Sequence, residues 1–341
     1  MGQALDRRAL LFGAGGLLLG AAGCSGTPKT SAGPSQSTAT APASGPASTA
    51  ASASASVTHP SSASSSPSGL PATTAWSPDR DDVDPAVKLR AVQLVEAIGA
   101  WTAGRGGAAT AKRRVAALGA SPSLVDQAGA LLPTADAAAL QVVDAQYGGI
   151  LADSASVLVV CRQWTPGHAG GTTIDVRLSR AQPRWKVTAL HPARPGAALA
   201  SVPSAARQVL ADSRIVLPPA AQADIRSGNI HPSVLRAMLR LAGTYRMYIS
   251  VVRSGHPLDV FGTNRPSDHP RGRAFDVWQI DGHAVVDPGT SRRLVESFMR
   301  DAAAAGSYNV GGPLRLSGGA RANQFFTDNT HHDHVHVGFA A

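Results

Sequence analysis

The chain has 341 residues, of which 31 are Lys or Arg and 22 are Asp or Glu, giving a formal net charge of +9. This length favours two domains plus additional segments over one large core. The positive charge suits contact with anionic polymers and phospholipid surfaces. Aromatic residues make up only 5% of the chain, and neither clustered basic runs nor a nucleic-acid-binding motif is present, so we expect no nucleic-acid partner.

Residues 1–24 have the pattern of an export signal. Arg7 and Arg8 precede an apolar run, 9–22, that is too short for a comfortable membrane span and ends in small residues. The sequence 21–24, Ala-Ala-Gly-Cys, resembles a bacterial lipobox, and the paired arginines resemble a twin-arginine signal. This resemblance implies lipidation of Cys24 and an anchor on the outer face of the bacterial cell membrane. An uncleaved N-terminal anchor is the alternative, and it also places the body of the protein outside the cytoplasm.

A linker of low complexity follows. Residues 25–78 are almost entirely Ser, Thr, Ala, Pro and Gly, and such a composition cannot bury enough apolar surface to offset the entropy of ordering. A flexible chain of this length spans about 40 Å, and proline extends it further. We therefore expect the linker to separate the membrane anchor from the folded part.

Residues 79–195, called the accessory domain below, read as helices followed by strands. Asp84 as N-cap and Pro85 at the first helical position predict a helix to about Trp101. Two shorter helices are expected at 112–118 and 123–131, and strands are expected at 140–143, 157–161, 172–176 and 185–190. This order predicts an α+β domain and is similar to the nuclear-transport-factor-2-like fold. No catalytic set is evident in it, and we expect a spacer or an interaction module.

The last domain is expected at 220–341, after a connection rich in Pro and Ala at 193–220. Helices are predicted at 231–242 and 291–305. Strands are predicted at 246–252, 275–280, 283–286 and 334–339, with Asp281-Gly282 as a type I′ hairpin turn. The Gly-rich segment 307–329 is expected to form one wall of a cleft.

Two segments of this domain contain the side chains that zinc prefers. His269 and Asp276 are seven residues apart, and 331–336 holds four histidines and Asp333. Two imidazoles and one carboxylate complete a three-ligand set of the kind found in catalytic zinc sites. Seven residues of helix would rise about 10 Å, which is too far for two ligands of one ion. We therefore expect the chain to bend near Gly272 and return Asp276 to His269.

The pattern His-x-x-Gly-x-Ala-x-Asp at 269–276, followed by a late His-x-His, resembles the zinc peptidases that cut cell-wall peptides containing D-amino acids. These are the D-Ala-D-Ala carboxypeptidases, the L-alanyl-D-glutamate endopeptidases and the penicillin-insensitive murein endopeptidases, which share a fold with the Hedgehog signalling domain. The match covers about 220–341. The resemblance implies a zinc ion bound by His269, Asp276 and His336, peptidoglycan peptides as substrate, and an arginine for a substrate carboxylate, for which Arg253 is the candidate.

Two residues compete for the role of general base. The carboxypeptidases have an acidic residue three positions before the last histidine ligand, which is Asp333 here, and the murein endopeptidases have a histidine two before it, which is His334. On a regular strand His334 shares the face of His336, whereas Asp333 points away. A carboxylate is the readier proton acceptor, so we expect Asp333 to move the proton and His334 to stabilise the transition state.

Two other functions remain open on sequence grounds. A non-catalytic, zinc-containing wall-binding or signalling lipoprotein would fit the extra domain and the absence of a Glu-x-x-His pattern. A structural zinc site of that kind is usually closed by four protein ligands, whereas a catalytic one leaves a position for water. A glycan-cleaving enzyme would need two carboxylates flanking a sugar, and no such pair can be assigned.

Overall fold

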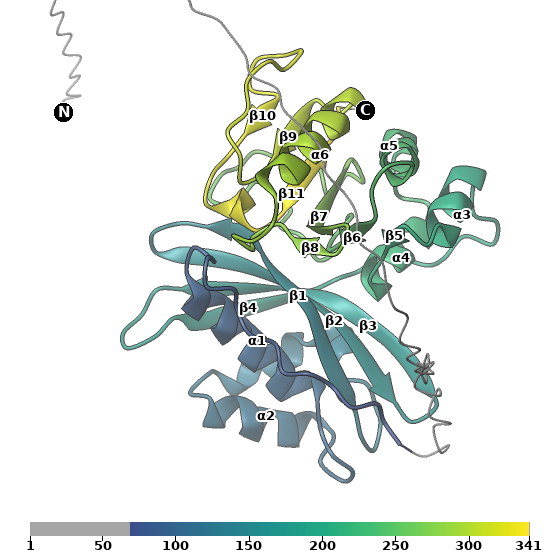
Figure 1. Cartoon of the computed structure of the whole chain (residues 1–341). Helices are drawn as coiled ribbons and strands as arrows, with labels where there is room; N and C mark the ends of the chain where they lie inside the picture. Colours follow the sequence, from purple (N-terminus) through teal and green to yellow (C-terminus); the bar gives the residue numbers. More distant parts are fainter. Residues whose placement is uncertain (1–68, 341) are drawn as a thin grey trace, which may run out of the picture. The chain divides into compact units, whose positions relative to one another are not determined.

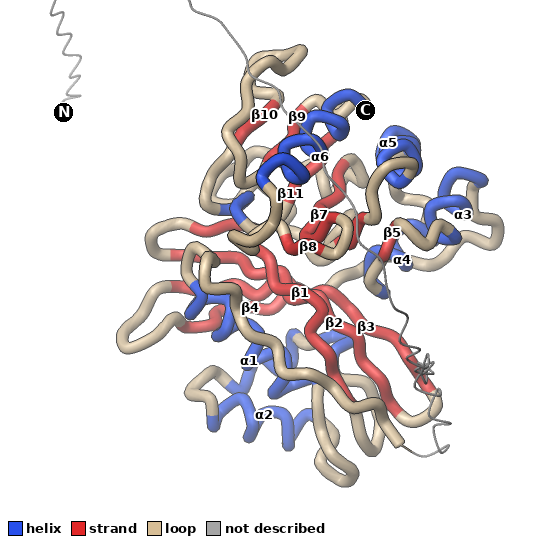
Figure 2. Tube along the Cα trace, in the orientation of Figure 1, coloured by secondary structure: helices blue, strands red, loops and turns tan. Residues whose placement is uncertain are grey.

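The computed structural model describes residues 69–340 and contains two β-sheets with helices packed against them (Figure 1). The expected signal segment 1–24, with Cys24, and most of the expected linker 25–78 lie outside the described residues. Both helices and antiparallel strands occur in the two halves (Figure 2), so the α+β class predicted from the sequence is confirmed.

The accessory domain begins with helices and continues into a four-stranded antiparallel sheet of order β1-β2-β3-β4. Its elements are α1 (Pro85–Gly99), α2 (Ala108–Ala117), the 3₁₀ segments η1 (Pro122–Gln127) and η2 (Gly129–Leu131), β1 (Ala139–Ile150), β2 (Ser154–Thr165), β3 (His168–Ser179) and β4 (Lys186–Pro192). The helices α1 and α2 lie on one face of this sheet in Figure 1. Each of the first three strands has twelve residues and extends beyond the short apolar run from which it was predicted.

The expected helix start was right and one expected helix was wrong. Asp84 is the N-cap of α1 and Pro85 its first residue, as predicted, although the Asp84 carboxylate makes no capping bond and instead accepts a hydrogen bond from Trp185 Nε1 at 3.2 Å. The single helix expected at 123–131 is divided into η1 and η2, since Gly129 has a φ of +54° that no α-helix accommodates.

The C-terminal half is built on a seven-stranded sheet of order β10-β9-β11-β7-β6-β5, with β8 paired to β7. Its elements are α3 (Ser204–Ala211), β5 (Ile215–Val216), α4 (Pro219–Arg226), α5 (Pro232–Ala242), β6 (Met247–Ile249), β7 (Ala274–Ile280), β8 (His283–Ala284), α6 (Arg292–Ala304), β9 (Asn309–Gly311), β10 (Phe325–Phe326), the 3₁₀ segment η3 (Thr330–His332) and β11 (Val335–Gly338). The turn between β7 and β8 has positive φ at both Asp281 and Gly282, as a type I′ hairpin requires.

The stretch 193–220 is more than a connection. It contains α3 and β5, and α4 begins within it. Val209 and Ile215 are buried in the core of the C-terminal sheet, so their apolar side chains order a segment whose Pro and Ala content had indicated a linker.

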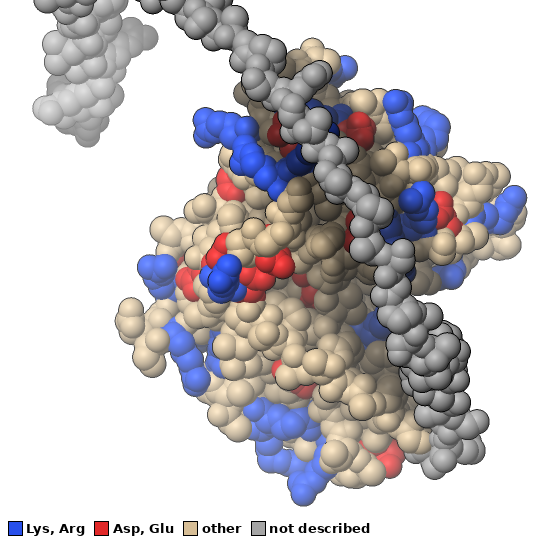
Figure 3. Space-filling model, in the orientation of Figure 1, with Lys and Arg blue, Asp and Glu red and all other residues tan. Residues whose placement is uncertain are grey.

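Each sheet has its own hydrophobic core, and residues 69–340 fall within one compact unit. Within that range, none of the helices is long and apolar enough to cross a membrane. On the face drawn in Figure 3, the basic side chains form several separate groups.

Candidate metal centre

Three side chains from distant parts of the chain meet at one point in the C-terminal half. The Nε2 atom of His269 lies 3.1 Å from Asp276 Oδ1 and 3.1 Å from His336 Nδ1, and His336 Nδ1 lies 3.0 Å from Asp276 Oδ1. His269 and Asp276 are fully buried, and His336 keeps 8% of its surface exposed. The atoms converge as the ligands of a single ion do, and His269, Asp276 and His336 are called the triad below.

Strand pairing explains how two triad members meet. The antiparallel register of β7 and β11 places His336 directly opposite Asp276, and directly opposed side chains on one face lie within about 5 Å of each other. His269 reaches them through a turn that is closed by a hydrogen bond of 2.8 Å from Gly272 N to the carbonyl oxygen of His269.

Gly272 makes the bend that the spacing of His269 and Asp276 predicted. Its φ is +68°, which favours glycine. A Cβ atom at this position would lie 2.0 Å from the carbonyl oxygen of Asn229. Only glycine therefore fits between the two ligands at this point of the turn.

The protonation pattern of the triad favours a cation. His269 Nδ1 donates a hydrogen bond to the Val252 carbonyl at 3.0 Å, so in the neutral ring Nε2 presents a lone pair. Asp276 Oδ1 presents only lone pairs as well. Burial alone would raise the pKa of Asp276, but the imidazoles of His269 and His334 hold it well below its usual range. The set of two imidazoles and an ionised carboxylate thus has the chemistry of a divalent metal site.

His256 is a further nitrogen donor near this point. His256, His269 and Asp276 form a group that could hold a metal ion, with ligand atoms within 4.8 Å of one another. However, the His256 ring stacks on that of His269, with centroids 4.1 Å apart and planes at 18°. A ring nitrogen's lone pair lies in the plane of its ring, so the lone pairs of these two nearly parallel rings do not converge on one point. The His336 ring is inclined by 59° to His269 and can share an ion with it.

His334 and Asp333 lie beside the triad and differ in what they face. His334 Nδ1 donates to Asp333 Oδ1 at 2.6 Å, and His334 Nε2 lies 3.7 Å from Asp276 Oδ2. Burial by itself would lower the pKa of His334, but Asp276 and Asp333 raise it. The other oxygen of Asp333 points away from the triad, towards Lys88 Nζ at 2.7 Å and Tyr147 N at 3.0 Å.

Lys88 and Gln146 were not expected at this centre. Lys88 lies in α1 with its side chain 3% exposed, and Gln146 in β1 donates from Nε2 to Asp276 Oδ2 at 2.7 Å. The sequence contains a signal for the lysine, since position 88 shares the buried face of its helix with Ala91 and Val92. No local pattern marks the glutamine, which is one polar residue among several on a long strand.

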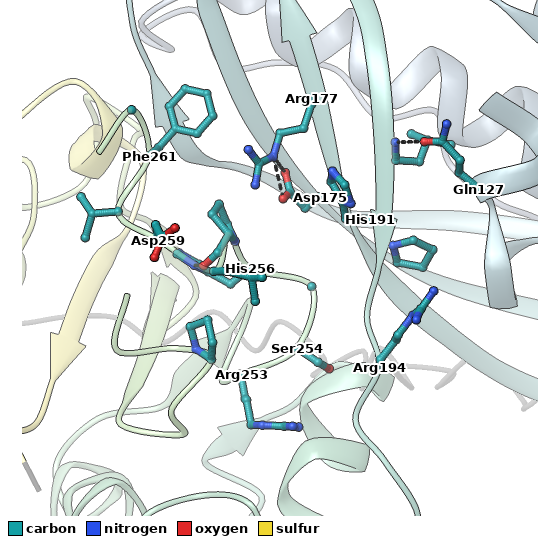
Figure 4. A pocket seen from close by; sticks show the side chains of 18 of the residues that line it. Gln127, Asp175, Arg177, His191, Arg194, Arg253, Ser254, His256, Asp259 and Phe261 are labelled. Carbon is teal, nitrogen blue, oxygen red and sulfur yellow. Dashed lines mark hydrogen bonds and ion pairs between the residues drawn. The ribbon is translucent and has the colours of Figure 1, made fainter. Parts of the chain in front are cut away.

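A cavity of about 950 Å³ adjoins the centre through His256 (Figure 4). It lies between strands β3 and β4 of the accessory domain and the loop 253–263. Arg253 lines it, with Nη1 at 3.3 Å from Asp224 Oδ1 and 3.1 Å from the Pro195 carbonyl, so the candidate carboxylate-binding arginine is already paired. Arg194 also lines the cavity and has no hydrogen bond or ion pair within 69–340.

Comparison of the chain with family models, with curated proteins and with solved structures found no match. The assignment of a function therefore depends on the residues of the centre and their geometry.

Proposed function

We propose that this protein is a zinc-dependent peptidase that cuts peptide bonds in peptidoglycan stem peptides or cross-links. The observation behind the proposal is the spacing of the three triad atoms, 3.0–3.1 Å apart. Ligand distances of about 2.0 Å in a tetrahedral zinc site put neighbouring donor atoms about 3.3 Å apart. His269, Asp276 and His336 would hold the ion, and His256, which stacks on His269, would leave the site open to water or substrate.

The chain's own residues supply positioning and proton transfer. Zinc would contribute Lewis-acid activation of water and of the scissile carbonyl. His334 is the better placed of the two base candidates, because its Nε2 faces the triad while both oxygens of Asp333 are engaged elsewhere. We therefore assign proton transfer or oxyanion stabilisation to His334 and its orientation to Asp333.

The substrate class follows from the family resemblance and from the surroundings of the centre. The sequence 269–276 and the late His-x-His resemble zinc peptidases of the bacterial wall and the Hedgehog-like fold. The helices and four-stranded sheet of the accessory domain are similar in order to the nuclear-transport-factor-2-like fold. The cavity beside His256 is lined by Arg194, whose guanidinium suits a peptide with a free carboxylate; Arg253 also lines it but is paired with Asp224. An anchor at Cys24 would hold the protein at the membrane surface, within reach of the wall.

A non-catalytic zinc module is the second candidate, and His256 is the observation that favours it. Its ring nitrogen lies close enough to the triad that a rotated ring would close the site with a fourth protein ligand, as structural zinc sites are closed. The variant His256→Phe keeps an aromatic ring stacked on His269 and removes the nitrogen. A catalytic site should keep its zinc in this variant, whereas a closed site should release it.

The test of the proposed function is digestion of purified muropeptides by the full chain, followed by mass spectrometry of the products. We expect cleavage that stops with a chelator and returns when zinc is added. His269→Ala should abolish both zinc binding and cleavage. The exposed His283 in β8 provides the control, since His283→Ala should keep both. Zinc binding without cleavage of any muropeptide would contradict the peptidase and favour the structural site.

A further inference from the structure

The accessory domain donates a hydrogen bond to the triad from the buried amide of Gln146. Gln146 Nε2 donates to Asp276 Oδ2 at 2.7 Å, and Gln146 Oε1 accepts a hydrogen bond from Ser250 Oγ. Gln146 is 1% exposed. Because the amide occupies Oδ2, only Oδ1 of Asp276 is directed at His269 and His336. The amide therefore determines both the rotation of the carboxylate and which oxygen it offers to a metal.

The backbone of β1 is shaped to bring Gln146 to this position. The pairing of β1 with β2 shifts register between Tyr147 and Gly149, which marks a bulge that bends the strand. At Gly149, an added Cβ atom would lie 2.1 Å from Phe261 Cβ, so glycine allows the loop 253–263 to pack on the strand. The bulge in β1 and the close packing of the loop 253–263 thus both shape the strand that carries Gln146.

A second connection leads from α1 to His334. Lys88 Nζ lies 2.7 Å from Asp333 Oδ2, which also accepts a hydrogen bond from Tyr147 N, and Asp333 Oδ1 accepts a hydrogen bond from His334 Nδ1. All of these side chains are buried. A buried lysine is strongly destabilising unless it is paired, and here its partners are Asp333 and Asp82. The accessory domain therefore holds the carboxylate that orients the imidazole beside the triad.

We propose that the accessory domain is an integral part of the metal centre, in which Gln146 positions Asp276 and Lys88 positions His334 through Asp333. Both are positioning residues, since neither touches the metal position. The inference rests on the triad being a zinc site, which is one part of the proposed function. The sequence led us to expect a spacer or an interaction module. The inference instead gives the accessory domain a specific role in metal affinity and in the geometry of the centre.

The first test is the zinc dissociation constant of the full chain, measured by competition with a chromophoric chelator. Gln146→Leu removes the amide at similar volume, and we expect zinc to bind about 10–100-fold more weakly, as for other partners of metal-bound carboxylates and imidazoles. Gln141 lies on the same strand and bonds to the backbone of Thr74, so Gln141→Leu is the matched control and should bind zinc as the wild type does. Equal affinities in all three proteins would overturn the proposal.

Two further variants keep the test decisive if Gln146→Leu does not fold. Ser250→Ala removes the hydrogen bond to Gln146 Oε1 from the opposite side, and a three- to tenfold weaker zinc affinity is expected; an unchanged affinity would contradict the proposal. Lys88→Met should leave zinc affinity within about threefold and lower kcat without changing KM. In the cobalt-substituted protein, Gln146→Leu should also shift the visible absorption bands, which report ligand geometry.

These measurements separate this inference from the peptidase proposal. If the wild type binds zinc but cuts no muropeptide, the peptidase proposal fails, and the ratio of zinc affinities still decides the role of Gln146. If muropeptides are cut but Gln146→Leu binds zinc normally, the peptidase proposal stands and the integral role of the accessory domain fails.

Discussion

Asp333 and His334 are adjacent in sequence, yet only one of them faces the triad. The Asp333 carboxylate is bound by Lys88, Tyr147 N and His334, so it has no oxygen left for a proton at the metal position. Within residues 69–340, His334 Nε2 makes no hydrogen bond and lies 3.7 Å from Asp276 Oδ2. The contacts thus favour His334 for the chemistry and Asp333 for its alignment.

We expect His334→Ala to lower turnover by about 10²–10⁴-fold, the usual contribution of a general acid or base, and to keep zinc. Asp333→Asn keeps the shape of the side chain and should lower turnover by only about 10–100-fold. Rates of muropeptide cleavage, with zinc content as the control, measure both. If Asp333→Asn lost more activity than His334→Ala, Asp333 would be the base.

The Asp333 carboxylate also predicts a pH dependence of stability. Burial opposes ionisation, but Lys88 and His334 lower the pKa of Asp333 to about 2, below its ordinary value near 3.8. A lowered pKa means that the ionised carboxylate stabilises the fold above about pH 4, and that this contribution is lost as the pH falls towards 2. Asp82, Asp144 and His334 also face the Lys88–Asp333 pair and titrate in the wild type. The contribution of Asp333 is therefore measured as the difference between the wild type and a variant that lacks only this carboxylate.

The free energy of unfolding of the wild type minus that of Asp333→Asn should therefore fall by roughly 2 kcal/mol between pH 5 and pH 2. Denaturant titrations with a chelator present, which removes any metal contribution, measure this difference. Asp126 forms an exposed pair with Lys112, and the corresponding difference for Asp126→Asn should stay within about 0.5 kcal/mol. A difference for Asp333 that does not change with pH would contradict the role of the Lys88 pair.

The turn between His269 and β7 is the element that brings two ligands together. Gly272→Ala would place a methyl group against the Asn229 carbonyl in a left-handed backbone conformation. We expect the free energy of unfolding to fall by about 2–4 kcal/mol, from strain plus the steric clash, and zinc affinity to fall because His269 moves relative to Asp276.

Gly282 is the matched control for this turn. It also has a positive φ, of +88°, but an added Cβ would meet no atom within 4 Å. Gly282→Ala should therefore lose only the strain contribution, about 1 kcal/mol, and leave zinc affinity unchanged. Denaturant unfolding and chelator competition on both variants separate the clash from the strain. Equal losses in the two variants would show that the contact with Asn229 does not limit this position.

For the molecule as a whole, the sequence predicts attachment to the membrane through Cys24. The substitution Cys24→Ala should move the protein from the detergent phase to the aqueous phase after detergent extraction of membranes, because lipidation needs the thiol. The matched control is Cys161→Ala, since Cys161 is buried in the accessory sheet and its loss should not change partitioning. A Cys24→Ala protein that stays in the detergent phase would rule out the lipid anchor.

The sequence by itself determined the α+β class, most elements and the ligands that we assign to the metal. These predictions depend on local information. The motif at 269–276 contains its own turn residue, Gly272, and the His-x-His pattern precedes a strand whose apolar residues enter the core. Ligand chemistry limited the candidates to the histidines and aspartates of two segments, and the family resemblance singled out Asp276 and His336, although their pairing in register is a tertiary feature.

Only the tertiary structure decided which neighbours surround those ligands. Gln146 and Lys88 are 130 and 245 positions from Asp276 and Asp333 respectively, and no periodicity connects residues so far apart. Whether Asp333 or His334 faces the triad also depended on a partner, Lys88, in another part of the fold. A hydrogen bond or ion pair between distant segments forms only after both sheets have packed, so its partners cannot be identified from either segment alone.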